Sequence, residues 1–119
     1  MRLTLISHTD QVTRLECEGE ITQYALPKER DAFEDLLGPA IYRRQVLLNM
    51  EKTPYTDSSG ISWLIGSHKR FERDGGRLII HSVPPAVGQV LRLLKLNTLL
   101  HVAADEAEAV QRAGGAQVS

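Results

Sequence analysis

The sequence predicts an α/β fold built on one mixed β-sheet. In the C-terminal half, apolar runs of strand length alternate with stretches of helical periodicity, which is the pattern of right-handed β-α-β crossovers between parallel strands. Residues 1–20 instead contain two strand-like segments separated by a polar stretch, which favours an antiparallel hairpin. The length of 119 residues and the 42% hydrophobic content suit a single core. We therefore expect one domain over residues 1–112 and a flexible tail at 113–119.

The first elements are the hairpin and a short helix. Strands are expected at residues 2–7 and 12–18, because apolar and polar residues alternate in the second of them. An amphipathic helix should follow, with Pro27 in its first turn and Gly38 at its end. Its apolar stripe consists of Ala32, Phe33, Leu36 and Leu37.

A buried strand, a serine-containing loop and a long helix form the centre of the chain. The apolar run at residues 45–51 predicts a central strand. A helix is expected over residues 59–73, with 74–76 as its glycine-rich stop. The face expected against the sheet carries Ile61, Leu64, Ile65, His68 and Phe71. The loop at 57–60 then lies at the carboxyl end of a parallel strand, where α/β sheets commonly hold their sites.

The remaining elements continue the alternation. Residues 77–82 predict a strand, and the segment from Pro84 to Asn97 predicts a helix. One face of this helix should carry Val87, Val90, Leu91 and Leu94. Residues 99–104 predict an edge strand, and residues 105–112 predict a short helix with an acidic start.

Composition excludes several classes of function. The 14 basic and 15 acidic residues are well mixed and give a formal net charge of −1, so we expect neither a nucleic-acid partner nor an anionic membrane surface. No apolar run is long enough to span a bilayer, and we expect no membrane insertion. Cys17 is the only cysteine, which excludes an internal disulfide and fits a cytoplasmic protein. The four histidines show no close pair in the sequence, so we expect neither a metal nor a cofactor.

The segment Asp57-Ser58-Ser59-Gly60 is the main candidate site. Ser58 or Ser59 is expected to cap the following helix, and Gly60 is expected to permit a close approach of the chain. Alternatively, one hydroxyl is phosphorylated, which adds about −1.5 to −2 charges that a helix N-terminus tolerates. Beside Asp57, that charge would repel an acidic partner and act as a switch in binding.

A serine hydrolase is the alternative of another class. His68 lies ten residues after Ser58 on the same helix, about 15 Å away, so it is not the base for that serine. No Gly-X-Ser-X-Gly motif is present, and the remaining histidines could reach Ser58 only through the tertiary fold. We therefore expect a protein that is not an enzyme.

The outer face of the central helix offers a second candidate surface. Its members are expected to be Ser59, Ser62, Trp63, Gly66, Ser67 and Arg70. A tryptophan among small residues is typical of an interface anchor, although Trp63 could equally pack beneath a neighbouring helix or loop. The first alternative predicts one docking surface formed by Trp63 and the serine loop together.

Three segments of the chain resemble the STAS domain, specifically the bacterial anti-sigma factor antagonists. They are "TDSSG", "RDGGRLII" and "VPPAVGQVLRLLKLNTLLHVAADEAEAV". "GEIT" at residues 19–22 is similar to the Gly-Glu-Leu turn that precedes the first helix of that family. The likeness covers nearly the whole chain. It implies the STAS-type mixed sheet packed against helices, and a regulator rather than a catalyst.

The resemblance also implies a partner-switching mechanism. In that family the unphosphorylated antagonist binds an anti-sigma factor that is also a serine kinase, phosphorylation with ATP releases it, and a serine phosphatase resets it. The expected phosphorylation site is Ser58. The expected partner-binding residues are Asp57, Ser58, Ser59, Gly60, Ser62, Trp63 and Gly66.

The chain departs from the family pattern after the serine motif. Many members continue with Gly-Leu-Gly, whereas this chain has Ser62 at the second glycine position, followed by Trp63. A side chain at this position changes how closely a kinase can approach. This departure leaves open a scaffold that is not phosphorylated, or a subunit associated with a transporter.

Overall fold

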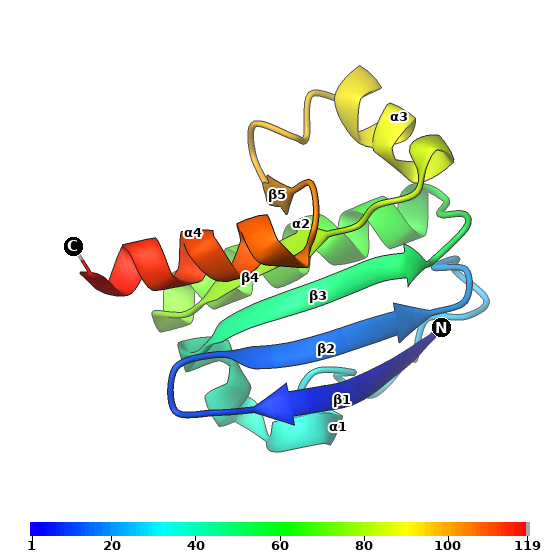
Figure 1. The fold of residues 1–119 in the computed structure, drawn as a ribbon. Coiled ribbons are helices and arrows are strands. Elements are labelled where there is room, and N and C mark those ends of the chain that lie inside the picture. Colours follow the sequence, from blue (N-terminus) through cyan, green and yellow to red (C-terminus); the bar gives the residue numbers. More distant parts are fainter. Residues whose placement is uncertain (119) are drawn as a thin grey trace.

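Five strands form one sheet in the order β1-β2-β3-β4-β5 in the computed structural model, which describes the backbone of residues 1–118 and the side chains of residues 1–113 (Figure 1). The strands are β1 (Arg2–His8), β2 (Thr13–Glu18), β3 (Gln45–Lys52), β4 (Arg77–His81) and β5 (His101–Ala103). β1 pairs with β2 in antiparallel orientation, and the other three pairs are parallel. The predicted hairpin, the parallel β-α-β units and the mixed sheet are therefore confirmed.

Helices cover both faces of this sheet. On one face lie α1 (Glu34–Leu37), the 3₁₀ turn η1 (Pro39–Arg43) and the long helix α2 (Ser58–Asp74). Helix α4 (Glu106–Val118) covers the opposite face, and α3 (Pro85–Leu93) projects beyond the sheet near β5 (Figure 1). The sheet is thus the middle of three layers.

The central strand β3 shows why the apolar run in the sequence is continuous. Val46 and Leu48 point into the core shared with α1 and α2, whereas Leu47 points into the smaller core beneath α4. None of the three side chains is exposed to solvent. A strand that is buried on both faces carries apolar residues on both, which explains the continuous apolar run, and the predicted central strand is confirmed.

The first helix is shorter than predicted. Instead of a helix starting near Pro27, the chain is irregular until α1, which has a single turn. The Asp31 carboxylate accepts hydrogen bonds from the backbone N–H groups of Phe33 and Glu34, and with these bonds the helix begins only at Glu34. The predicted stripe still reaches the core, because Phe33 is fully buried.

The ends of α3 and α4 also differ from the sequence prediction. Helix α3 ends at Leu93 rather than at Asn97, because Lys95 adopts a left-handed backbone conformation. Leu94, predicted on the buried face, is consequently 56% exposed. Helix α4 continues past residue 112 to Val118. Ser119 and the side chains of 114–118 lie outside the described residues, and the flexible tail stays a prediction.

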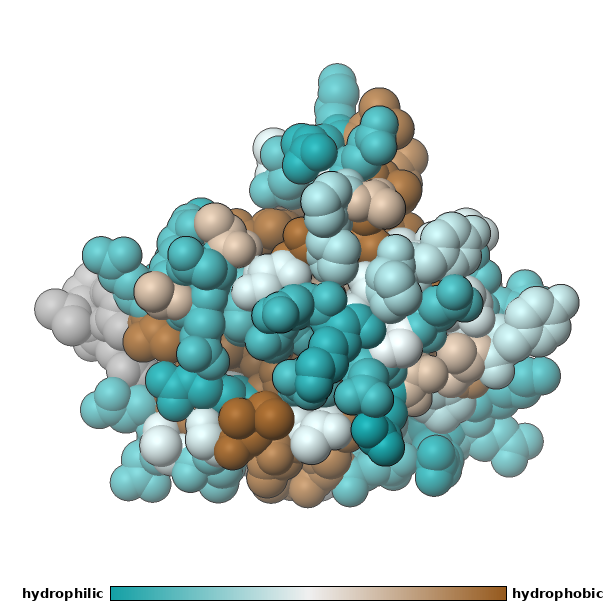
Figure 2. Space-filling view, turned by 45° about the vertical axis from the view of Figure 1, so that its right-hand side comes forward, coloured by the Kyte–Doolittle hydropathy of each residue, from teal (hydrophilic) through white to brown (hydrophobic). Residues whose placement is uncertain are grey.

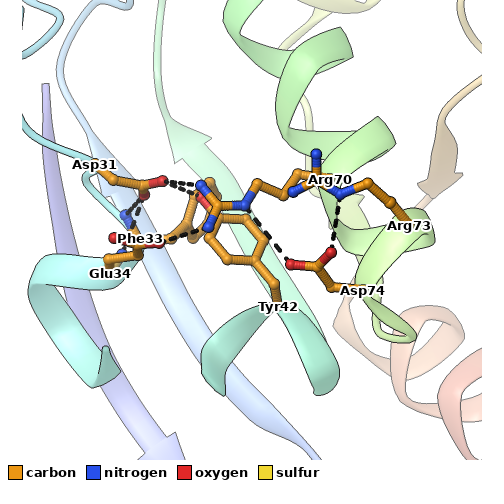
Figure 3. Close-up of polar contacts among 7 residues, drawn as sticks. All are labelled: Asp31, Phe33, Glu34, Tyr42, Arg70, Arg73 and Asp74. Carbon is orange, nitrogen blue, oxygen red and sulfur yellow. Dashed lines mark hydrogen bonds and ion pairs between the residues drawn. The ribbon is translucent and has the colours of Figure 1, made fainter. Parts of the chain in front are cut away.

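Arg70 of α2 holds the irregular segment and η1 in place (Figure 3). Its guanidinium pairs with Asp31 at 3.2 Å and Glu34 at 2.7 Å, and lies 4.2 Å from the centroid of the Tyr42 ring. The Tyr42 hydroxyl donates a 2.6 Å hydrogen bond to the same Asp31 carboxylate. Burial, followed by this hydrogen bond to Asp31, raises the pKa of Tyr42 well above its ordinary value. The segment that follows β2 is thus attached to the outer side of α2.

Candidate functional site

The serine loop is attached to the segment that follows β2. The backbone N–H of Ile21 donates to the carbonyl of Tyr55 at 3.1 Å, and the N–H of Asp57 donates to the carbonyl of Ile21 at 3.2 Å. The Thr56 hydroxyl donates to the same Ile21 carbonyl at 3.0 Å. These bonds join the carboxyl ends of two neighbouring strands, so the loop before α2 has a defined shape.

Asp57 is the residue that caps α2. Its Oδ1 accepts a hydrogen bond from the N–H of Gly60 at 3.0 Å, and its Oδ2 accepts one from the N–H of Gln23 at 3.1 Å. The prediction that Ser58 or Ser59 caps the helix is therefore wrong. Only a carboxylate offers two oxygens for both backbone donors, and these bonds lower the pKa of Asp57 below its ordinary value.

Gly60 is required by the close approach of two chain segments. A Cβ atom at this position would lie less than 3.0 Å from the Thr56 hydroxyl oxygen and from the Ile21 carbonyl oxygen. The Ile21 oxygen belongs to the backbone, and the Thr56 hydroxyl is hydrogen-bonded to it, so neither can easily move aside. The predicted role of this glycine is thus confirmed.

The Ser58 side chain lies at the rim of an apolar groove. Ser58 is exposed in the first turn of α2, and its hydroxyl has no hydrogen-bond partner among the described residues. The groove has a volume of about 510 Å³. It is lined by Tyr55, Thr56, Asp57, Ser58, Ile61, Ser62, Val90 and Leu94. The candidate serine is therefore open to an incoming protein.

Helix α3 supplies the hydrophobic wall of this groove. Val90 of this helix and Leu94, which directly follows it, line the groove, and Leu94 is 56% exposed. Leu93, which is not among the lining residues, is 74% exposed. Figure 2 shows hydrophobic surface on the part of the molecule that projects from the body. Exposed leucines next to a groove are typical of a surface that another protein covers.

Trp63 is a packing residue as well as a surface residue. Its ring is stacked on that of Phe33, with centroids 5.4 Å apart and an angle of 3° between the planes. Trp63 therefore packs beneath a neighbouring loop, the segment before α1, and its role as an interface anchor stays a prediction. Gly66 is exposed and, with Trp63, lines a hollow beside Lys28 and Arg70. Five of the seven predicted partner-binding residues thus line two separate depressions beside α2: Asp57, Ser58 and Ser62 line the groove, and Trp63 and Gly66 line the hollow.

The four histidines have their contacts away from Ser58. His8 is hydrogen-bonded to Thr13, and His81 to Ser82. His68 contacts the ring of His101, with centroids 5.2 Å apart, and burial lowers its pKa. Among the described residues, no histidine forms a nucleophile–base pair with the serine loop. Although the histidines form no close pair in the sequence, the fold brings His68 and His101 together.

Sequence reasoning also missed several residues of the site. Val90 and Leu94 were assigned to the buried face of α3, yet they line the groove. Tyr55 was given no role in the sequence analysis, yet it lines the same groove. Leu94 is exposed because α3 ends at Leu93, before the left-handed Lys95, and hydrophobic periodicity does not reveal this end.

Comparisons with known proteins agree with this fold. A family model of the STAS domain matches residues 5–109, and the chain belongs to this family. An anti-sigma-B factor antagonist of Staphylococcus aureus (strain NCTC 8325 / PS 47) is 26% identical over 95 residues, which are 78% of this chain and 84% of that protein. The alignment extends over most of both proteins.

Solved structures with similar folds come from two kinds of protein. The anti-sigma factor antagonist SpoIIAA in its unphosphorylated form has a TM-score of 0.60 and 22% identity, over 95% of this chain and 98% of that one. The murine anion transporter Slc26a9 has a TM-score of 0.77 and 15% identity, over 92% of this chain but only 18% of the transporter. Among the described residues, no helix is long and apolar enough to cross a membrane.

Proposed function

We propose that this protein is an anti-sigma factor antagonist whose binding is switched by phosphorylation of Ser58. Its partner is an anti-sigma factor that acts as a serine kinase and binds the ATP, and a serine phosphatase reverses the modification. The protein itself catalyses no reaction in this role and acts in the bacterial cytoplasm. The exposed Ser58 hydroxyl at the rim of the apolar groove is the main support, together with the name of the S. aureus relative.

The groove supports binding of the unphosphorylated form. Burying the exposed part of Leu94 and its neighbours under a partner removes apolar surface from water, at about 25 cal/mol for each Å². A partner bound there would also cover Ser58, because that residue shares the groove with Val90 and Leu94. The modified residue is therefore inside the contact and not remote from it.

Phosphorylation changes the charge of this contact more than the fold. A phosphate on Ser58 would sit at the N-terminus of α2, where the helix dipole favours negative charge. Asp57 next to it is a carboxylate at neutral pH, and its backbone hydrogen bonds lower its pKa further below the ordinary value. Two adjacent anionic groups beside an apolar groove would hold water and repel an acidic partner surface.

Mass spectrometry of the protein from its own host tests the modification. The intact mass should fall by one phosphate after phosphatase treatment, and fragmentation should place that phosphate on Ser58. The controls are Ser58→Ala, which should abolish the modified form, and Ser62→Ala, which alters an exposed serine of the same groove and should leave it intact. An unmodified protein under every growth condition would contradict the switch.

A scaffold or transporter-associated subunit that is not phosphorylated is the second candidate. Ser62 lines the groove where many related antagonists have glycine, and the fold is shared with part of an anion transporter. In that role the protein would bind its partner constitutively. Equal affinity of the protein before and after treatment with the kinase would favour this candidate.

A further inference from the structure

We propose a second site, a binding site for a zinc-type transition-metal ion, formed by His68, Glu72 and His101. One ring nitrogen of each histidine and one carboxylate oxygen of the glutamate lie within 4.8 Å of one another. His68 and Glu72 are one turn apart on α2, so they share a face of the helix. His101 begins the edge strand β5. The three residues therefore connect the second half of α2 to the edge of the sheet.

The donor atoms have the chemistry that a late first-row metal requires. Two imidazoles and one carboxylate make up a known three-residue ligand set for Zn²⁺, and the fourth position is left for water. A purely acidic cluster would instead favour calcium or magnesium. The mixture of two nitrogens and one oxygen thus favours a transition-metal ion such as Zn²⁺ over calcium or magnesium.

The buried ring of His68 gives an independent indication. This residue is only 8% exposed, and its Nδ1 is buried without a hydrogen-bond partner among the described residues. Buried polar atoms of this kind are rare in folded proteins, because each lost hydrogen bond costs about 1–3 kcal/mol. A ligand held by this ring would account for an imidazole placed at a buried position of α2.

The two other side chains are free to adjust around an ion. His101 is 34% exposed and Glu72 is 47% exposed, and their Nε2 and Oε1 atoms are already 2.9 Å apart. Ligand atoms around tetrahedral Zn²⁺ are about 3.3 Å from one another, so the His101–Glu72 pair must open by about 0.4 Å and the pairs with His68 must close by at most about 1.5 Å. Rotations of exposed side chains can supply this movement while His68 stays fixed.

A metal at this position would hold β5 against α2. β5 has only three residues and pairs with β4 alone, so it is the least supported strand of the sheet. The site is ten residues or more from Ser58 along α2, about 15 Å away. Metal binding is therefore separate from the proposed phosphorylation, and either can fail without the other.

The test is a titration of tag-free, chelator-treated protein with Zn²⁺, followed by calorimetry and thermal unfolding. We expect one ion per chain and a rise of several degrees in Tm at excess metal, and no such effect from Mg²⁺. Co²⁺ should give visible absorption bands of a low-coordinate nitrogen–oxygen site.

The variants Glu72→Gln and His101→Gln should each weaken Zn²⁺ binding at least tenfold while the metal-free protein stays folded. Matched controls are Glu51→Gln and His8→Gln, which alter exposed residues of the same types elsewhere and should bind as the parent does. Absence of binding at one ion per chain would overturn the proposal. Unchanged affinity in Glu72→Gln and His101→Gln would also overturn it, leaving the His101–Glu72 pair as an ordinary ion pair.

Discussion

The two glycines of α2 should respond in opposite directions to the same substitution. In Gly60→Ala, the added methyl overlaps the Thr56 hydroxyl and the Ile21 carbonyl, and it is also 3.0 Å from Cγ2 of Ile21. In Gly66→Ala, the methyl meets nothing within 4 Å. The first change forces the serine loop away from the chain that follows β2, whereas the second only replaces a flexible residue inside a helix.

The magnitudes follow from these contacts. Overpacking costs about 1–3 kcal/mol, and displacement of the Thr56–Ile21 hydrogen bond adds about 1 kcal/mol. A small gain in helix propensity partly offsets these two costs, so Gly60→Ala should lower the free energy of unfolding by about 2–3 kcal/mol. Gly66→Ala should raise it by about 0.5–1 kcal/mol, because alanine is the better helix former.

Urea denaturation followed by circular dichroism measures both variants. The midpoints should move to opposite sides of the parent value with an unchanged slope. Thermal unfolding should separate the two variants by about 10–16 °C, at roughly 4 °C for each kcal/mol in a domain of this size. A neutral Gly60→Ala, or equal shifts in both variants, would refute the claim that this glycine is set by the approach of Ile21 and Thr56.

Three further predictions concern the surroundings of the site. Trp63→Ala removes the ring stacked on Phe33 and should lower the free energy of unfolding by about 2 kcal/mol in urea, whereas Trp63→Phe should lose less; equal losses would argue against the stack. Asp57→Asn keeps one acceptor for the two backbone donors, so its urea midpoint should fall less than that of Asp57→Ala, and the reverse order would be inconsistent with capping. Burial lowers the pKa of His81 below its ordinary value of 6.5, although two carboxylates at the start of α4 act in the opposite direction. The folded state therefore favours the neutral imidazole, so the stability that His81 contributes is complete above pH 6.5 and is lost on acidification. His81→Gln should therefore flatten the fall in stability between about pH 7 and 5, and an unchanged fall would assign it to other groups.

The sequence was sufficient for the features that depend on local periodicity. The run at 45–51 became β3, buried on both faces, and the spacing of Ile61, Leu64 and Phe71 placed the inner face of α2 correctly. Such patterns are visible because each element meets the core along one stripe or in one continuous run. The hairpin followed from the same reasoning.

The features that were missed depend on residues far apart in the chain. Asp57, rather than a serine, caps α2 because the N–H of Gln23 supplies a second donor from the segment after β2. Trp63 packs on Phe33, thirty positions earlier, which no pattern within α2 reveals. His68 and His101 meet only because β5 returns beside α2. Periodicity defines a face of a helix but not the segment that covers it.

The affinity of the protein for its cognate anti-sigma factor, measured before and after phosphorylation by that kinase, tests the proposed switch most directly. The unphosphorylated protein should bind, and phosphorylation should weaken binding at least tenfold. Ser58→Ala should bind and resist the kinase, whereas Ser59→Ala, altered at the neighbouring serine, should still be switched. Equal affinity of the two forms, or a switch that survives in Ser58→Ala, would contradict the assignment of Ser58 as the regulatory residue.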